Sequence, residues 1–161
     1  MVEQHKQACM DKMQSICEKE YSIPLQNIQT ILGVKMRAAT SLIAEIGTDM
    51  SHFETANHLA SWSGLRSRND QSNKTIKSRR ITHRNRYLRR IIIQCAWGAS
   101  RAQNSFFSHF SYYQTQVRKK NKMKVLVAIA RKMLICVWHI LNDNVPDKDF
   151  SNRISTSVQN G

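Results

Sequence analysis

The feature that most constrains the fold is an apolar stripe with helical spacing in the second half of the chain. Over residues 84–102, apolar side chains recur three or four positions apart, at Leu88, Ile91, Ile92, Cys95, Ala96 and Ala99. Residues at this spacing lie on one face of an α-helix, so the stripe predicts a long helix packed against a core. Glycine and proline number only 5 and 2, which favours long helices over a turn-rich β fold.

Further helices are predicted by the same periodicity, and we expect an all-α fold of about seven helices. The strongly apolar run 125–141 is interrupted by Arg131, Lys132 and His139, so it predicts a buried core helix and not a membrane span. We divide the chain into an N-terminal helix (1–23), a helical domain (24–145) and a polar, flexible tail (146–161). The remaining predicted helices are 5–20, 25–32, 36–46, 56–62 and 106–117.

Charge is distributed unevenly. The chain holds 25 Lys and Arg against 11 Asp and Glu, and no acidic residue lies between Asp70 and Asp143, where 16 Lys and Arg occur. A region of one charge sign repels itself unless a polyanion is near, and nucleic acid is the usual polyanion. An anionic membrane surface is a competing interpretation, which we rank last because the core uses the apolar faces.

The basic residues are densest in residues 66–90. Because residues 65–83 lack apolar periodicity, we expect one long loop there, followed by the start of a helix. The basic side chains of residues 66–90, opposed only by Asp70, should bind phosphates, and the sequence indicates no base preference. They are Arg66, Arg68, Lys74, Lys77, Arg79, Arg80, Arg84, Arg86, Arg89 and Arg90.

Residues 25–46 have the pattern of a helix-hairpin-helix motif, two apolar helical segments joined by Gly33-Val34-Lys35. In that motif a tight turn exposes backbone amides beside a helix N-terminus, where they suit a phosphate oxygen. We therefore expect Gly33, Val34 and Lys35 to contact nucleic acid. Lys35 stands where the usual motif has a second glycine, and an ordinary αα-hairpin is the alternative.

No metal-binding pattern is visible. None of the four cysteines belongs to a CxxC pair, and no carboxylate cluster has metal spacing. We expect no cofactor in this chain, and a reducing cytoplasm because no secretory signal opens the sequence. Ser72, in Asp-Gln-Ser-Asn-Lys, is a loop serine and a poor nucleophile unless its surroundings activate it.

Four blocks, taken together, resemble the C-terminal domain of a bacterial insertion-sequence transposase family. The blocks are LQNIQTILGVKMRAATSLIAEIG, FETANHLASWSGL, RRITHRNRYLRRIIIQCAW and KVLVAIARKMLICVWHILND. Their order and spacing are similar to those of the DEDD-type family, which includes pilin-gene invertases and bridge-RNA-guided recombinases. The resemblance covers about residues 24–145.

The resemblance implies a recombinase domain that contributes a nucleophilic serine, carried over here to Ser72, with Ser78 as the alternative. Arg79, Arg80 and Arg84 would hold the phosphate. The family's partners are DNA and a structured guide RNA, and its Asp-Glu-Asp-Asp metal site lies in an N-terminal RuvC-like domain. We expect that domain to be absent from this chain and residues 1–23 to be the remnant of a coiled-coil linker.

Three positions depart from the family pattern. Asn73 follows Ser72 where the family prefers glycine, Arg84 replaces a second glycine of the loop, and Lys35 replaces the hairpin glycine. We predict a DNA-binding part of a transposase, inactive alone, that works with a separate RuvC-like half or as a homo-oligomer, without a membrane. The alternative is a non-catalytic DNA- or RNA-binding module or a decayed transposase remnant.

Overall fold

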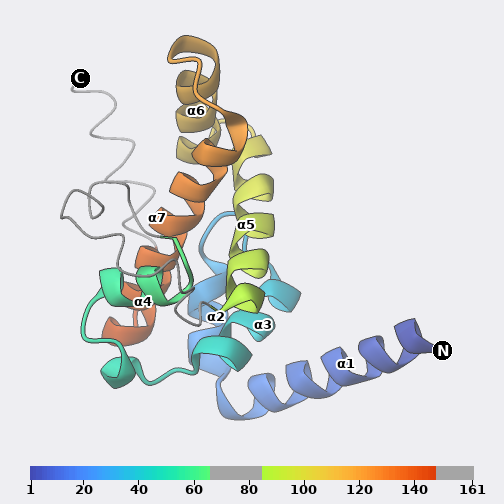
Figure 1. The fold of residues 1–161 in the computed structure, drawn as a ribbon. Coiled ribbons are helices and arrows are strands. Elements are labelled where there is room, and N and C mark those ends of the chain that lie inside the picture. The colour runs from blue at the N-terminus through green and yellow to red at the C-terminus, as the bar shows by residue number, and fades with distance from the viewer. Residues whose placement is uncertain (66–84, 148–161) are drawn as a thin grey trace, which may run out of the picture.

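The computed structural model describes residues 1–65 and 85–147, and over these residues the chain is all-α without strands (Figure 1). This confirms the prediction of an all-α fold. A 3-10 turn (Met50–His52) precedes α4, and a π-helix (Tyr113–Val117) continues α6. The seven α-helices are α1 (Val2–Glu20), α2 (Ser22–Gln29), α3 (Met36–Ile46), α4 (Ala56–Trp62), α5 (Arg86–Arg101), α6 (Phe106–Tyr112) and α7 (Lys122–Asp143).

The centre of the fold is the pair α5 and α7, which lie side by side along most of their length (Figure 1). The predicted stripe of α5 is buried at Leu88, Ile92, Cys95, Ala96 and Ala99. Helix α7 is long and apolar enough to span a membrane, but half of its most apolar stretch is buried inside the fold. It packs against α2, α4, α5 and α6, which confirms the prediction of a core helix.

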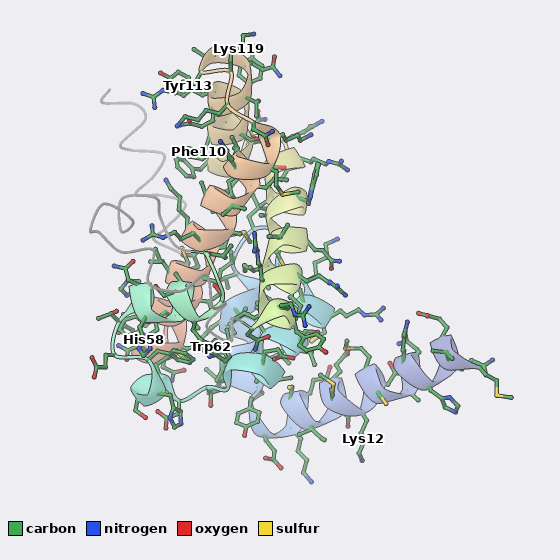
Figure 2. The ribbon with its side chains drawn as sticks, in the orientation of Figure 1. Lys12, His58, Trp62, Phe110, Tyr113 and Lys119 are labelled. Atoms are coloured by element: carbon green, nitrogen blue, oxygen red, sulfur yellow. The ribbon has the colours of Figure 1, made fainter. Side chains whose placement is uncertain are left out.

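Helix α1 projects from this body into solvent (Figure 1). Only Cys17 is buried along its length, and it meets α2 and α3 near its C-terminal end. Lys12 lies on the projecting part, away from the other helices (Figure 2). The structure thus attaches α1 at one end and leaves the rest of its surface open.

Helix α2 differs from its predicted bounds, because it begins at Ser22 and ends at Gln29. Pro24 fits in its first turn, where a backbone N–H has no helical partner to lose. Beyond Gln29 the backbone tightens: Ile31 N–H donates to the Ile28 carbonyl and Val34 N–H to the Ile31 carbonyl, both at 3.1 Å. The residues up to Val34 therefore form the turn that leads into α3.

Two other boundaries were also imprecise. The predicted helix 106–117 is α6 followed by the π-helix, whose wider turn is closed by Arg118 N–H donating to the Tyr113 carbonyl at 3.0 Å. Helix α7 begins at Lys122, before the apolar run 125–141, because Asn121 caps it by accepting from Met123 N–H.

The end of α7 is tied to α2. Asp147 N–H donates to Thr30 Oγ1 at 2.7 Å, which brings the half-buried Asp147 carboxyl to the C-terminal end of α2. Burial raises the pKa of Asp147 to about 6, well above its ordinary value of 3.8. The folded protein therefore binds a proton at Asp147 more tightly than the unfolded chain does.

We expect Asp147→Asn to stabilise the fold at pH 7 and to have little effect near pH 4. Because the folded pKa is the higher one, wild-type stability should fall as the pH rises from about 4 to about 6. Solvent screening of a half-exposed carboxyl limits the difference at pH 7 to about 1 kcal/mol. Urea unfolding from pH 4 to pH 8 measures this difference, and an asparagine variant that keeps the wild-type profile contradicts the prediction.

Candidate nucleic-acid interface

Three exposed arginines occupy the first two turns of α5: Arg86, Arg89 and Arg90. Asn85 caps this helix, since its Oδ1 accepts from Tyr87 N–H at 3.1 Å and from Leu88 N–H at 3.0 Å. Its Nδ2 donates to Glu45 Oε2 on α3 at 2.8 Å. One side chain thus starts the arginine-bearing turns and fastens them to α3.

The same residue holds the exit of the basic segment beside its entrance. Asn85 N–H donates to the Trp62 carbonyl at 3.1 Å, at the end of α4. The fully buried Leu65 donates its own N–H to the Ala60 carbonyl at 2.9 Å. The two ends of the segment 66–84 are therefore anchored to one place on the fold, between α4 and the N-terminus of α5.

Gly33 lies against the backbone of α5. It adopts a φ of +91°, and a Cβ at this position would lie 2.7 Å from the Cys95 carbonyl oxygen and 3.0 Å from Ala99 Cβ. Only glycine fits there without a shift of α5, because both the dihedral and the space exclude a side chain. Gly33 therefore sets how closely the turn packs against α5.

The three residues of the turn, Gly33, Val34 and Lys35, were all predicted to contact nucleic acid, but they differ in what they expose. Val34 is buried, and its N–H is already used by the Ile31 carbonyl. Lys35 is exposed at the N-cap of α3, and no side chain caps the first amides of that helix. Of the three predicted hairpin residues, Lys35 is thus the one whose side chain is open to a ligand, beside amides that favour an anion.

A hollow of about 310 Å³ separates the start of α3 from α5. Lys35 and Arg37 line it from α3, and Gln94 lines it from α5; none of its lining residues is acidic. Arg90 lies one turn before Gln94 on α5, so it stands at the same helix face. Sequence reasoning missed Arg37, Gln94 and Asn85, because their role depends on how α3 meets α5.

The structure thus brings Lys35 close to the α5 turn of Arg90, while Arg86 and Arg89 add exposed positive charge toward the start of α5. Ser72 and the other predicted basic residues lie outside the described residues: Arg66, Arg68, Lys74, Lys77, Arg79, Arg80 and Arg84. The alternative nucleophile Ser78 lies outside them as well.

The four cysteines are free, with Cys17, Cys95 and Cys136 buried and Cys9 exposed. Burial raises the pKa of Cys95 to about 11 and that of Cys136 to about 12, so both are neutral packing groups at physiological pH. Within residues 1–65 and 85–147, no group of three His, Cys, Asp or Glu side chains is arranged to hold a metal ion.

Comparison with known proteins bears directly on this surface. The sequence profile of the transposase IS116/IS110/IS902 family matches residues 25–111, more than half of the chain. The chain belongs to this transposase family. The match includes most of α2, the Gly33 turn, α3, α4, α5 and most of α6, so every residue of the hollow lies within it.

Two curated relatives agree with this assignment. The pilin gene-inverting proteins of Moraxella lacunata and Moraxella bovis are each 29% identical to the chain over 140 residues. The alignment covers 86% of this chain but 42% of each relative. The chain therefore spans less than half the length of the curated relatives it matches.

Proposed function

We propose that this chain is a DNA-binding part of an IS110-type transposase and contacts duplex DNA through the start of α5 and the Gly33 turn. The observation that carries the proposal is the acid-free hollow between α3 and α5, bordered by Lys35 and Arg37. Arg90 adds an exposed guanidinium group one turn before the hollow, and Arg86 and Arg89 add two more toward the start of α5. Such an arrangement suits the phosphates of a DNA backbone, which arginine binds through paired hydrogen bonds.

The helix-hairpin-helix interpretation of α2, the turn and α3 belongs to this proposal. A phosphate oxygen would sit at the uncapped amides of Met36, Arg37 and Ala38, with Lys35 beside it. Gly33 would act indirectly, by holding the start of α3 at the right distance from α5. This differs from the simplest form of the motif, in which the turn amides themselves hold the phosphate.

Duplex binding measured across a salt series tests the proposal. We expect wild-type affinity to fall steeply with the logarithm of the salt concentration, because each phosphate contact releases counterions. Arg86→Ala/Arg89→Ala/Arg90→Ala should weaken binding about tenfold at low salt and reduce the slope by roughly 0.9 per lost contact. Arg118→Ala/Lys119→Ala/Lys120→Ala, beyond the far end of α5, removes the same charge and serves as the matched control.

Two outcomes count against the proposal. If the wild-type chain fails to bind duplex DNA even at low salt, the proposed duplex-binding function is refuted. If the two triple variants lose duplex affinity equally, binding depends on net charge and not on the α3 and α5 surface.

In the full reaction we propose Ser72 as the nucleophile. Its Oγ would form a bond to a backbone phosphorus while a phosphorus–oxygen bond of the DNA strand breaks. The hydroxyl proton would pass to solvent, and the departing oxygen would take up a proton to leave a free hydroxyl end. Arg79, Arg80 and Arg84 would stabilise the charge on the phosphate.

The hydrogen bonds of Leu65 and Asn85 support this assignment, because they hold these two flanking residues at one place beside the start of α5. Incubation with DNA, a guide RNA and a RuvC-like half should give a denaturant-resistant protein–DNA adduct. Ser72→Ala should abolish the adduct while leaving duplex affinity unchanged, and Ser78→Ala is the control. Loss of the adduct in Ser78→Ala alone would transfer the role to Ser78.

A further inference from the structure

The far end of the α5–α7 pair forms a second exposed basic surface. We call residues 112–124 the tip; it includes the end of α6, the π-helix and the start of α7 (Figure 1). Five of the seven residues 118–124 are Lys or Arg, all are exposed, and the tip has no acidic residue. Lys119 lies at its outermost point, with Tyr113 below it (Figure 2).

Within residues 1–65 and 85–147, the tip cations have no acidic partner. In the parts of the chain that the structure describes, the only ion pairs are Lys6 with Glu3 and His52 with Asp49, both remote from the tip. The cations nearest the body instead lie over aromatic rings. Lys122 Nζ is 4.6 Å from the centre of the Trp97 ring, and Arg118 lies 5.7 Å from the centre of Tyr113.

Two tyrosine rings add an aromatic surface among these charges. Tyr112 is 66% exposed and Tyr113 is 48% exposed, at the point where α6 continues into the π-helix. Phe107, an aromatic residue of the same helix α6, is buried in the core instead. The exposed rings therefore contribute little to packing and are open to a partner from solvent.

The tip has a defined backbone conformation. Lys119 adopts a left-handed φ of 54°, which is unfavourable for a side chain other than glycine. The turn is closed by Lys120 N–H, which donates to the Gln114 carbonyl at 2.9 Å, and by Arg118 N–H, which donates to Tyr113. This turn fixes the lysines next to the tyrosines, because all of these residues belong to one hydrogen-bonded unit.

We propose that the tip binds an unpaired DNA strand, with bases stacked on Tyr112 and Tyr113 and phosphates held by Arg118, Lys119 and Lys120. This inference rests on the proposed DNA-binding function and adds a second, distinct surface to it. Stacking needs a free base face, which a duplex hides and a single strand offers. An anionic membrane is less favoured, although Val117 and Met123 of the tip are also exposed, because the exposed rings are tyrosines, whereas Trp, Phe and Leu are usual on a membrane-inserting face.

The position of the tip makes the two surfaces separable. Helix α5 runs from Arg86, the first of its three exposed arginines, to Arg101 near the tip, and its 16 residues span roughly 24 Å. That length corresponds to about seven base steps of DNA at 3.4 Å each. One DNA molecule with a duplex part and an unpaired tail can therefore reach both surfaces at once.

Fluorescence anisotropy on the full chain tests the proposal with four probes: a thymidine oligonucleotide of about 20 nucleotides, a blunt duplex, the same duplex with an unpaired tail, and oligouridylate. Tyr112→Ala/Tyr113→Ala should weaken single-strand binding about tenfold without changing duplex binding. The affinity gained from the unpaired tail should disappear in the same variant. Tyr112→Phe/Tyr113→Phe should keep the affinity, because stacking needs the ring and not the hydroxyl.

Tyr87→Ala removes an equally exposed tyrosine at the opposite end of α5 and is the matched control. The proposal is overturned if Tyr112→Ala/Tyr113→Ala leaves single-strand affinity unchanged, or if it weakens duplex binding to the same extent. Binding of oligouridylate alone, or of phosphatidylglycerol vesicles without the oligonucleotide, also overturns it. Tyrosine-dependent single-strand binding without any duplex binding would support the tip and refute the proposed function.

Discussion

Gly33→Ala is expected to lower the free energy of unfolding by about 2–4 kcal/mol. The φ of +91° costs an alanine about 1 kcal/mol or more. The added Cβ would lie 2.7 Å from the Cys95 carbonyl oxygen, and relieving that contact between a turn and a helix backbone costs about 1–3 kcal/mol. Urea unfolding followed by circular dichroism measures the loss.

Two other glycines separate these contributions. Gly47 has a φ of +76°, but a Cβ added there would meet nothing within 4 Å, so Gly47→Ala should cost about 1 kcal/mol from the dihedral alone. Gly98 is exposed inside α5, where a Cβ would also meet nothing, and Gly98→Ala should stabilise the fold by roughly 0.5–1 kcal/mol. If Gly33→Ala lowers the free energy of unfolding no more than Gly47→Ala does, the contact with the Cys95 carbonyl costs nothing, and the prediction is wrong.

Asn85→Ala is expected to lower the free energy of unfolding by about 2 kcal/mol, which is the second-largest effect that we expect. The substitution removes the cap that accepts from Tyr87 and Leu88 N–H, and such losses are worth about 0.5–2 kcal/mol. It also leaves the partly buried Glu45 carboxylate without its donor. Because the same side chain fastens the arginine-bearing turns of α5 to α3, duplex affinity should fall together with stability.

Thr55→Ala is the control for this prediction. Thr55 caps α4 by accepting from His58 N–H at 3.1 Å, a hydrogen bond that stays within the first turn of α4. Its loss should cost about 1 kcal/mol and leave duplex affinity unchanged while the protein is folded. Asn85→Asp keeps the cap but places a second carboxylate beside Glu45, so it should fall between wild type and Asn85→Ala. Equal effects of Asn85→Ala and Thr55→Ala on both properties would show that the Glu45 link contributes nothing.

Local periodicity accounts for what the sequence predicted well. The stripe from Leu88 to Ala99 predicted α5 and its buried face, and the apolar run 125–141 predicted α7 as a core helix. Gly47 ends α3 as expected, with the positive φ that a side chain disfavours. These features depend on residues within a few positions of one another, so the order of residues is enough to predict them.

The sequence predicted the helix ends less well, because there the hydrogen-bond spacing along the backbone changes by one residue. The end of α2 tightens before Leu32, and the end of α6 widens into a π-helix from Tyr113. Apolar spacing does not distinguish these cases, because a helix that tightens or widens by one position keeps nearly the same buried face.

The sequence by itself determined an all-α chain, its helical core and a positive charge too dense to remain without a polyanion. Only the tertiary structure decided which charges act together, since the hollow brings Lys35 beside Gln94 and Asn85 bonds to Glu45, forty positions away. It also decided that Gly33 is needed for the approach to α5, and that Tyr112 and Tyr113 are exposed among the lysines of the tip. The reason is physical: periodicity fixes which face of a helix is buried, while the partners of each exposed group depend on how separate helices pack.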